Sequence, residues 1–248
     1  MSVLPIRLRK AIRALGYERD RKALLAGVAG SLEHAAVLRT LPTARTILDI
    51  GANRGQFILE AIKWHPNATF YAFEPLPTER TRMERVLAGL PRVSIFPFAL
   101  GEADGSVEFQ VSSAADSSSV LKQTKLQGEF FPGTQNIGQH DVQIRRLDNV
   151  IDRSALIGPV VCKIDVQGYE LNVLKGFGDL IDAVDYLIIE VSNVPFYQGA
   201  PNSAEVISFL AERGFRIDGM YNMYGPRSVC LQLDILFSRG SASGDAAL

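Results

Sequence analysis

Cysteine is scarce in this sequence, which has only Cys162 and Cys230 among its 248 residues. The two do not have the spacing of metal ligands, so the sequence predicts neither a cysteine-based metal site nor a disulfide framework. Cys162 lies within an apolar run, as a buried thiol usually does. The cysteine content therefore favours a cytoplasmic protein without disulfides.

An excess of one charge is also missing. The 26 lysines and arginines and the 27 aspartates and glutamates leave a net charge of −1, whereas nucleic-acid-binding domains usually have a strongly basic surface. No apolar run reaches the roughly 20 residues of a membrane span, and no segment has the pattern of a signal peptide. With this length, these absences favour one soluble globular domain, with or without a lid, and no nucleic-acid partner.

The strongest local charge bias lies at residues 1–25, where seven basic residues stand against two acids. Within this stretch, Leu4 to Leu15 has apolar residues at helical spacing, which predicts a basic amphipathic helix. Membrane contact through this helix is one interpretation, but we favour a lid helix packed on the domain. A second helix is expected over Leu24 to Leu41, and Pro42 would end it.

The stretch Thr46 to Gly55, with the sequence TILDIGANRG, organises the rest of the chain. It begins as a short apolar strand with Asp49 near its end, turns through glycines, and continues into a helical pattern from Gln56 to Lys63. A strand, a glycine turn and a helix N-terminus form a nucleotide-type pocket in a parallel sheet. Because Asp49 is an anion, it suits a ligand with cationic groups, such as S-adenosylmethionine, and would repel the pyrophosphate of a dinucleotide.

A second carboxylate supports the same pocket. Residues Ala68 to Phe73 have the pattern of the next strand, and Glu74 follows them directly. A carboxylate about 20 residues beyond the glycine turn accepts hydrogen bonds from ribose hydroxyls. The alternative is an α/β domain with an unrelated turn and two solvated acids, and we consider it the less favoured interpretation.

Beyond Glu74, strand and helix patterns alternate, as in an α/β sheet with helices on both faces. Prolines open a helix predicted from about Thr78 to Leu87, and a later helix is predicted over Ser203 to Arg213, with Ser203 as its N-cap. The domains predicted from these patterns are a helical lid at 1–42, an α/β domain at 43–239 and a flexible tail at 240–248.

The strands of this domain are expected at regular intervals. Ser106 to Val111 is an extra strand, expected to form a hairpin with its predecessor across residues 101–105. Ser112 to Asp141 lacks regular patterning, and so long a loop is usually functional or mobile. The other strands are predicted at Val93–Phe98, Val142–Leu147, Val160–Asp165, Tyr186–Val191, Phe215–Asp218 and Leu231–Phe237.

Six short segments match one known family pattern: DIGANRGQF at 49–57, FEP at 73–75, ALG at 99–101, SSSVL at 117–121, LD at 147–148 and KIDVQGYE at 163–170. From Ile47 to Phe237 the chain resembles the FkbM family of S-adenosylmethionine-dependent methyltransferases. The resemblance implies a Rossmann-like class I α/β fold, whose seven-stranded, mostly parallel sheet has the order 3-2-1-4-5-7-6 with strand 7 antiparallel. Gln167 stands where many relatives have glutamate, which weakens any role of this position as acid, base or metal ligand.

The resemblance also implies how the methyl donor, S-adenosylmethionine, is held. The glycine turn would contact its methionine part, Asp49 its ammonium group and Glu74 its ribose hydroxyls. Adenine usually sits after the third strand in this fold, where Asp104 or Asp116 is a weaker candidate for contact. The implied cofactor-binding residues are Asp49, Gly51, Asn53, Gly55, Phe57, Glu74, Pro75, Ala99, Leu100 and Asp165.

Methyl transfer to a hydroxyl needs a group that removes the hydroxyl proton. Asp165 at the end of the fourth strand and Glu170 at the start of the next helix are candidates. Their alternative roles are a helix N-cap for Asp165 and favourable placement in a helix dipole for Glu170. His140 is the alternative base. Lys163 lies in an apolar strand and needs a partner, for which Glu190 is the candidate.

Two further groups leave alternatives open. Asp165, Glu170 and Glu190 are acids that a metal could use, but no ligand spacing demands a metal. The aromatic side chains in the later loops are expected either to offer flat faces to a sugar or macrocycle or to form a partly buried rim. These aromatic residues are Phe196, Tyr197, Tyr221 and Tyr224.

The sequence thus predicts an S-adenosylmethionine-dependent O-methyltransferase that acts on a hydroxyl of a sugar, glycan precursor or polyketide-type metabolite. A nicotinamide-dependent oxidoreductase is the enzymatic alternative, although the turn GANRG lacks the GxGxxG pattern. A non-catalytic S-adenosylmethionine-binding subunit is the other alternative, and the intact Asp165 and Glu170 count against it. The expected partner is a small-molecule or glycan acceptor, with no preference between a monomer and a homo-oligomer.

Overall fold

The structure of this protein is a computed structural model that describes residues 16–90, 92–226 and 228–239. The predicted basic helix at Leu4 to Leu15 and the predicted tail at 240–248 lie outside the described residues. The membrane contact suggested for that helix, and the division of the chain into lid, domain and tail, stay predictions.

Among the described residues before the first strand, 16–45, the chain forms three short helices, so the expected single helix from Leu24 to Leu41 is wrong. Gly27 adopts a φ of +73° and ends the first helix, as a glycine in the left-handed conformation commonly does. Ala23 and Val37, on either side of this break, are both buried. The helices are α2 (Glu18–Leu25), η1 (Leu32–His34) and α3 (Ala35–Thr40).

A seven-stranded sheet forms the centre of the molecule, in the order β3-β2-β1-β7-β8-β10-β9. Only β10 runs against its neighbours, pairing antiparallel with both β8 and β9. Numbered in chain order, these strands have the order 3-2-1-4-5-7-6, which confirms the predicted topology. Their bounds are β1 (Thr46–Ile50), β2 (Thr69–Phe73), β3 (Val93–Phe96), β7 (Val160–Ile164), β8 (Tyr186–Ser192), β9 (Phe215–Tyr224) and β10 (Gln232–Arg239).

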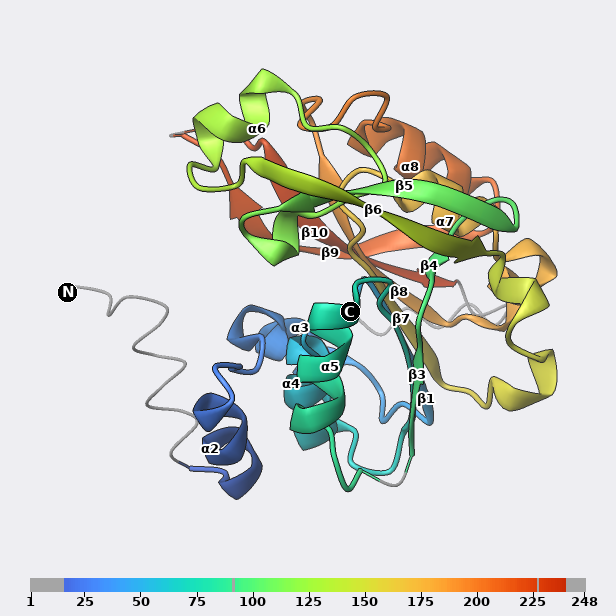
Figure 1. Cartoon of the computed structure of the whole chain (residues 1–248). Helices are drawn as coiled ribbons and strands as arrows, with labels where there is room; N and C mark the ends of the chain where they lie inside the picture. Colours follow the sequence, from blue (N-terminus) through green and yellow to red (C-terminus); the bar gives the residue numbers. More distant parts are fainter. Residues whose placement is uncertain (1–15, 91, 227, 240–248) are drawn as a thin grey trace.

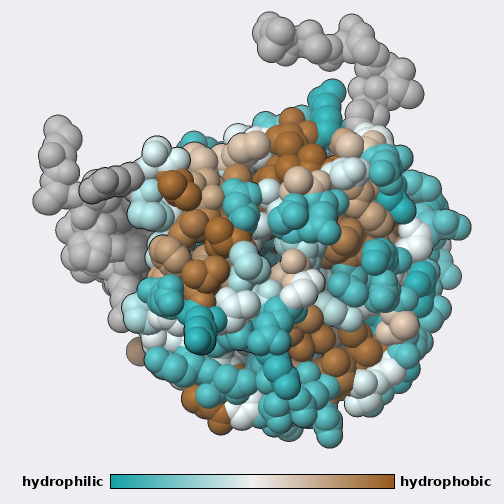
Figure 2. Space-filling view, turned by 90° about the horizontal axis from the view of Figure 1, so that it is seen from above, coloured by the Kyte–Doolittle hydropathy of each residue, from teal (hydrophilic) through white to brown (hydrophobic). Residues whose placement is uncertain are grey.

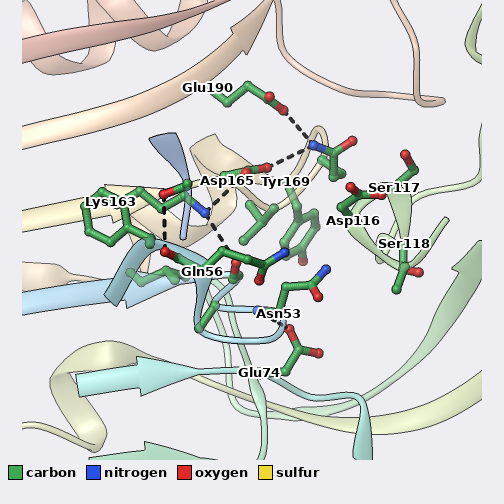
Figure 3. Close-up of a pocket in the computed structure, with 18 of the residues that line it drawn as sticks. Asn53, Gln56, Glu74, Asp116, Ser117, Ser118, Lys163, Asp165, Tyr169 and Glu190 are labelled. Atoms are coloured by element: carbon green, nitrogen blue, oxygen red, sulfur yellow. Dashed lines mark hydrogen bonds and ion pairs between the residues drawn. The ribbon is translucent and has the colours of Figure 1, made fainter. Parts of the chain in front are cut away.

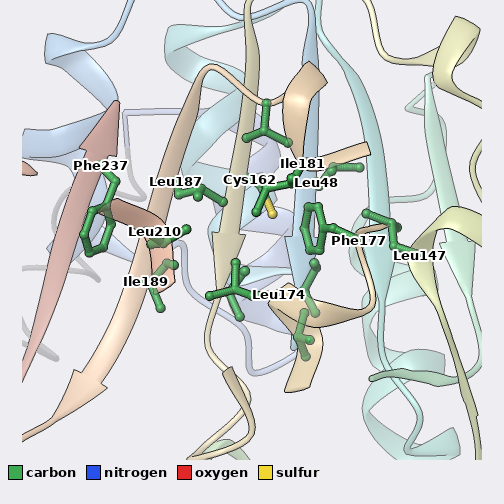
Figure 4. Close-up of a cluster of buried hydrophobic side chains, with 14 of the residues drawn as sticks. Leu48, Leu147, Cys162, Leu174, Phe177, Ile181, Leu187, Ile189, Leu210 and Phe237 are labelled. Atoms are coloured by element: carbon green, nitrogen blue, oxygen red, sulfur yellow. The ribbon is translucent and has the colours of Figure 1, made fainter. Parts of the chain in front are cut away.

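Helices cover both faces of this sheet, as Figure 1 shows. Ile47 of β1 packs in the cluster with α3, α4 and α5, whereas Leu48 packs in the cluster on the opposite face, because successive strand residues point to opposite faces. Figure 4 shows the second cluster, where Cys162 is buried beside Phe177, as predicted for this thiol. The helices are α4 (Gln56–Trp64), α5 (Pro77–Val86), α7 (Glu170–Lys175), α8 (Ser203–Ala211) and η5 (Gly178–Ala183).

A second, three-stranded sheet lies beside the central one (Figure 1) in the order β4-β6-β5. Its strand β5 pairs antiparallel with β6, for example Phe109 with His140. The expected hairpin between Ser106–Val111 and the preceding strand is therefore wrong. The loop expected over Ser112–Asp141 is also wrong, since this stretch contains two short helices and the first part of β6. The elements are β4 (Ala99–Leu100), β5 (Gly105–Ser112), η2 (Ala115–Ser117), α6 (Lys125–Phe130) and β6 (Asn136–Arg145).

The N-cap of helix α8 is Asn202, one residue before the predicted cap Ser203. The Asn202 side chain, not that of Ser203, accepts a hydrogen bond from the backbone of Glu205, whose carboxylate accepts one from the Asn202 backbone. This reciprocal pair is a capping box. None of the helices within the described ranges is long and apolar enough to cross a membrane. The remaining short helices are η3 (Leu147–Asn149) and η4 (Arg153–Ala155).

Candidate functional site

A cavity of about 590 Å³ lies at the carboxyl ends of the central strands β1, β2, β7 and β8. Ligands of open parallel sheets bind at this edge, where the strand order reverses. Figure 3 shows polar side chains from these strand ends facing Asp116, Ser117 and Ser118 across the cavity. We call residues 115–134, which contain η2 and α6, the roof segment, because they form the wall opposite the strand ends.

Gly51 forms the turn at the tip of β1 and lines the cavity. Its φ is +78°, and a Cβ atom added there would lie 2.0 Å from the carbonyl oxygen of Asp165. Only a residue without a side chain lets the tips of β1 and β7 approach so closely. Gly55, in contrast, is packed on Met83 and Leu87 of the α5 region and does not line the cavity, unlike its predicted role.

Glu74 lies at the tip of β2, with its carboxylate fixed by two backbone groups. It accepts hydrogen bonds from the N–H of Asn53 at 2.9 Å and of Leu76 at 2.8 Å. Burial raises the pKa of Glu74 to about 7, against the lowering effect of these two bonds. The carboxylate lines the cavity, at the position predicted to bind ribose.

Asp49 lies behind the cavity wall and does not itself line the cavity, and its contact with an ammonium group, directly or through water, stays a prediction. Its side chain is fully buried, and within the described part of the chain neither carboxylate oxygen accepts a hydrogen bond. Lys163 Nζ is 3.7 Å from Asp49 Oδ1. Burial raises the pKa of Asp49, and the charge of Lys163 opposes this rise.

Lys163 pairs with Asp165, not with Glu190 as predicted. Its Nζ lies 3.2 Å from Asp165 Oδ2 and donates to the carbonyl oxygen of Gly51 at 3.3 Å. Burial alone would lower the pKa of Lys163, but the charges of Asp165 and Asp49 raise it above its ordinary value. Burial would raise the pKa of Asp165, but Lys163 and a hydrogen bond from Gln167 hold it below the ordinary value.

Glu170, a predicted base, does not reach the main cavity. Its carboxylate accepts hydrogen bonds from the N–H groups of Gly168 at 2.9 Å and Val166 at 3.3 Å. It thereby closes the loop between β7 and α7. Burial raises the pKa of Glu170 to about 7. Asp165 does line the cavity. Its carboxylate forms an ion pair with Lys163 and accepts a hydrogen bond from Gln167, so it does not serve as the helix N-cap that was its alternative role.

His140, the other predicted base, is exposed on β6 and does not line the cavity. The structure brings a different histidine to the site. His34 of η1 lines the cavity, and its Nε2 lies 3.2 Å from Asp234 Oδ2. In the sequence, His34 lies within the helix expected over Leu24 to Leu41 of the lid. A single histidine in a segment without a motif does not indicate a functional site.

Aromatic side chains reach the cavity from the roof segment. Phe130 and Phe131 line it, whereas Phe196 and Tyr197 are buried beside them in a small core cluster. Tyr224 lies outside the lining and stacks on Phe131, with ring centroids 4.7 Å apart. The predicted aromatic faces therefore support the wall rather than form it. Tyr221 is also absent from the lining and packs with the cluster around α4.

The other predicted contacts are divided between the cavity and the surface. Asp104 is exposed and does not line the cavity. It accepts hydrogen bonds from the backbone of Arg146 and the side chain of Asn149. No group of three histidine, cysteine, aspartate or glutamate side chains within the described residues is arranged to hold a metal ion. The predicted residues that do line the cavity are Gly51, Asn53, Phe57, Glu74, Pro75, Ala99, Leu100, Asp116 and Asp165.

Three curated relatives share sequence with this chain. The 2-O-methyltransferase NoeI of Sinorhizobium fredii is 27% identical over 159 residues, which cover 62% of this chain and 65% of NoeI. The hexuronic acid methyltransferase AglP of Haloferax volcanii is 26% identical over 58% of this chain and 54% of its own. The 31-O-demethyl-FK506 methyltransferase FkbM of Streptomyces tacrolimicus is 26% identical over 75% and 77%.

The chain therefore spans less than two thirds of the length of NoeI and of AglP. A profile described as the methyltransferase FkbM domain matches residues 49–217 of this chain. The matched range begins at Asp49 in the tip of β1 and extends into β9, so it includes the strand ends around the cavity. With more than half of its residues matched, the chain belongs to the FkbM methyltransferase family.

Proposed function

We propose that this protein transfers a methyl group from S-adenosylmethionine to a hydroxyl of a sugar, glycan precursor or polyketide-type metabolite. The observation that carries the proposal is the cavity at the strand ends, which combines the Gly51 turn, the fixed Glu74 carboxylate and the acidic side chain of Asp165. Membership of the FkbM methyltransferase family supports it.

The residues of the cavity fit such a donor. Glu74 presents a fixed acceptor for hydroxyl groups, and Asn53 Oδ1 is buried without a hydrogen-bond partner among the described residues. Asp165, kept ionised by Lys163, provides negative charge for a cationic ligand. When bound, S-adenosylmethionine supplies a methyl group on a positively charged sulfur.

The protein's part in the reaction is to hold the two substrates and to move one proton. Effective transfer requires the acceptor oxygen within about 3.5 Å of the methyl carbon and in line with it. Gly51 and Glu74 would fix the donor on the strand ends. The roof segment, with Ser117, Ser118 and Phe131 on the cavity wall, would orient the acceptor.

The mixed character of the wall favours an acceptor that has both hydroxyl and apolar groups. The roof segment lines the cavity with the polar Ser117, Ser118 and Gln127 and with the aromatic Phe130 and Phe131. The outer face that carries α6 also has separate hydrophobic patches among hydrophilic side chains (Figure 2). Aromatic faces bind the apolar faces of ring compounds, and hydroxyl and amide groups bind their polar edges. The names of the relatives NoeI, AglP and FkbM describe O-methylation and a hexuronic acid substrate, which support this acceptor class.

A labelled-methyl assay tests the proposal. The full chain would be incubated with S-adenosylmethionine carrying a labelled methyl group and with panels of sugars, uronic acids and macrolide alcohols. Label in an acid-stable ether of one panel member is the expected result. Hydride transfer from NADH in the absence of methyl transfer would favour the oxidoreductase alternative, and donor binding without any labelled product would favour the binding subunit.

We further propose a cytoplasmic location and a small-molecule or glycan partner. The buried thiol of Cys162 and the free Cys230 suit a reducing compartment. Cell fractionation with an antibody against the chain checks the location, and recovery in a membrane or extracellular fraction would contradict it.

A further inference from the structure

A single amide group joins two acids on the floor of the cavity. Gln167 Nε2 donates to Asp165 Oδ1 at 2.9 Å and to Glu190 Oε2 at 2.6 Å, and both bonds are drawn in Figure 3. Gln167 Oε1 accepts a hydrogen bond from the Tyr197 hydroxyl at 2.7 Å, which fixes the direction of the amide. Gln167 itself has a φ of +57°. The two carboxyl groups are therefore held on either side of one nitrogen.

The two acids have unequal surroundings. Asp165 has the Lys163 ammonium group at 3.2 Å, whereas Glu190 has no ion pair within 4 Å among the described residues. Glu190 is paired in register with Asp234 across β8 and β10, and Asp234 in turn is shared between His34 and the Asn222 amide. One cation is thus bound close to Asp165, and Glu190 is left among acids.

We propose that Glu190 takes the proton of the acceptor hydroxyl, and that it gives up its own proton only when the cationic donor occupies the cavity. This inference rests on the proposed function and assigns a residue to its proton transfer. The carboxyl group lines the cavity next to Asp165. Its neighbours from each element packed on it are Lys163 and Asp165 of the β7 end, Glu170 of α7, Asp234 of β10 and Tyr197 after β8.

The charges around Glu190 explain this order of events. Burial, and then the charges of Asp165, Asp234 and Glu170, raise the pKa of Glu190 well above its ordinary value, and Lys163 opposes the rise. This burial and these charges favour the protonated form of Glu190 in the empty cavity. A positive charge nearby favours the ionised form of a carboxyl group, so a bound sulfonium ion lowers this pKa and prepares the base.

The proton and electron balance is complete without a further reactant. The carboxylate of Glu190 takes the proton from the acceptor hydroxyl, and an electron pair of the hydroxyl oxygen forms the bond to the methyl carbon. The bond between methyl carbon and sulfur breaks, and its electron pair stays on the sulfur, which becomes a neutral thioether. After the positive charge has been lost, Glu190 keeps the proton, and the protein returns to its resting protonation state.

Other groups at the site are less suited to this role. Asp165 is engaged by Lys163 and Gln167, which stabilise its ionised form and make it a weak base. Glu170 is closed off by the backbone of Val166 and Gly168. His34 Nδ1 is buried without a partner among the described residues, and its Nε2 faces Asp234, so neither nitrogen is open to an acceptor.

Calorimetry in two buffers tests the proposal without measuring activity. The full chain would be titrated at pH 7 with S-adenosylmethionine and with S-adenosylhomocysteine, in phosphate and in Tris, whose ionisation enthalpies differ strongly. The dependence of the observed heat on the buffer gives the protons released on binding. Proton release through Glu74 is common to both ligands, since both have the same ribose, so the difference between the two ligands isolates the effect of the sulfonium charge.

We expect S-adenosylmethionine to release up to about one proton more than S-adenosylhomocysteine. The variant Glu190→Gln keeps the shape and an acceptor for Gln167, and it should abolish this difference while S-adenosylhomocysteine binds within about threefold of the parent affinity. The control Glu84→Gln removes an exposed acid on α5 whose charge is not among those that act on Glu190, and it should retain the difference. Equal proton release by both ligands, or a difference that persists in Glu190→Gln, would overturn the proposal.

Turnover gives a second readout. Loss of a general base typically costs 10²- to 10⁴-fold, so Glu190→Gln should lower kcat about 100-fold or more with KM for the donor nearly unchanged, and Glu190→Asp should recover part of the loss. If the parent binds no S-adenosylmethionine, the proposed function fails. If it binds and methylates but shows no difference in proton release, only the assignment of Glu190 fails.

Discussion

The two walls of the cavity are built in different ways. The wall at the strand ends, which we call the donor wall, consists of residues 50–53, 56–57, 73–76 and 163–167. It is fixed by backbone groups, because Gly51 fits against the carbonyl of Asp165 and Glu74 accepts hydrogen bonds from two N–H groups. The roof segment is held by two backbone bridges, Ser119 with Gln110 and Gln123 with Tyr197. Side chains add to these, because Thr124 Oγ1 donates to the Pro195 carbonyl and Phe131 stacks on Tyr224.

This difference indicates at which positions of the cavity substitutions should be tolerated. The close approach of Gly51 to the Asp165 carbonyl demands glycine at that position, whereas an aromatic contact in the roof segment is retained by several side chains. The donor wall is therefore suited to a ligand that stays the same, and the roof segment to an acceptor that differs between relatives. Changes in the donor wall should affect folding and donor affinity, and changes in the roof segment should affect the acceptor alone.

The largest effect is expected for Gly51→Ala. A Cβ atom would lie 2.0 Å from the Asp165 carbonyl oxygen at a φ of +78°, so β1 and β7 must separate. We expect a loss of about 3 kcal/mol or more in the free energy of unfolding and no measurable donor binding. Gly89→Ala is a matched control: its φ is also +78°, but no heavy atom of the described residues lies within 4 Å of the added Cβ.

Denaturant unfolding of both variants measures the difference. Gly89→Ala should lower the free energy of unfolding by only about 1 kcal/mol, which is the cost of a side chain in the left-handed conformation. If the two variants were equally stable, the close contact between the strand tips would have no energetic weight, and the comparison of the two walls would lose its basis.

Glu74→Ala should weaken donor binding and also lower the free energy of unfolding, because the N–H groups of Asn53 and Leu76 lose their acceptor. Two hydrogen bonds from ribose hydroxyls to a carboxylate would be lost, and we expect a Kd about 10- to 100-fold higher. Because the pKa of Glu74 in the empty protein is about 7 and the ionised form is the acceptor, donor affinity of the parent should fall as the pH drops from 8 to 6. Calorimetric titration measures both effects, and a surface change, Glu84→Gln, is the control.

At pH 8, Glu170→Gln should have a higher free energy of unfolding than the parent, whereas at pH 5 the two proteins should be almost equally stable. The pKa of Glu170 is about 7 in the folded protein and ordinary in the unfolded chain, so the folded state binds more protons between these values and its stability falls as the pH rises. We expect a gain of about 1–2 kcal/mol at pH 8, where glutamine removes a buried charge, and almost none at pH 5.

Thermal unfolding across this pH range checks the sign. The amide oxygen of the introduced glutamine would still accept hydrogen bonds from the loop, so the gain would come from the charge. A gain that is larger at pH 5 than at pH 8 would show that the carboxyl group is not held in the neutral form by burial.

The smallest effect is expected for Phe131→Ala in the roof segment. Loss of one aromatic contact is worth about 0.5–1.5 kcal/mol, which corresponds to a KM for the acceptor about 3- to 10-fold higher, with donor affinity unchanged. Steady-state kinetics with the acceptor found in the labelled-methyl assay measures it. Tyr224→Phe keeps the ring that stacks on Phe131 and removes only the hydroxyl that bonds Phe130, so it should be milder still. If Phe131→Ala weakened donor binding as much as acceptor binding, the two walls would not act separately on the two substrates.

The sequence was most informative where local chemistry determines the backbone. The strand and glycine turn at Thr46 to Gly55, and Glu74 after the next strand, gave the position of the cavity, because the turn and the strand ends depend on residues that are close in the sequence. The sheet order came from the family resemblance. The position of Asp49 outside the cavity lining was not predictable, because a residue one position before a strand end points into the pocket or behind it according to the strand's twist and register.

Contacts between distant segments were not predictable from patterns. β5 pairs with β6, which begins 24 residues after β5 ends, and nothing in either strand indicates the partner. His34 and Asp234 meet across 200 residues, and Gln167 joins Asp165 to Glu190 only because β7 and β8 are neighbours. The same lack of long-range information led us to pair Lys163 with Glu190 and to place His140 at the site.

The most direct test of the account is calorimetric titration of the full chain with S-adenosylmethionine and with NAD, in parallel with the Glu74→Ala variant. We predict micromolar binding of S-adenosylmethionine by the parent, binding weaker by at least about tenfold in the variant, and no binding of NAD. Binding of NAD alone, or equal affinity of both proteins for S-adenosylmethionine, would contradict the assignment of this cavity as the methyl-donor site.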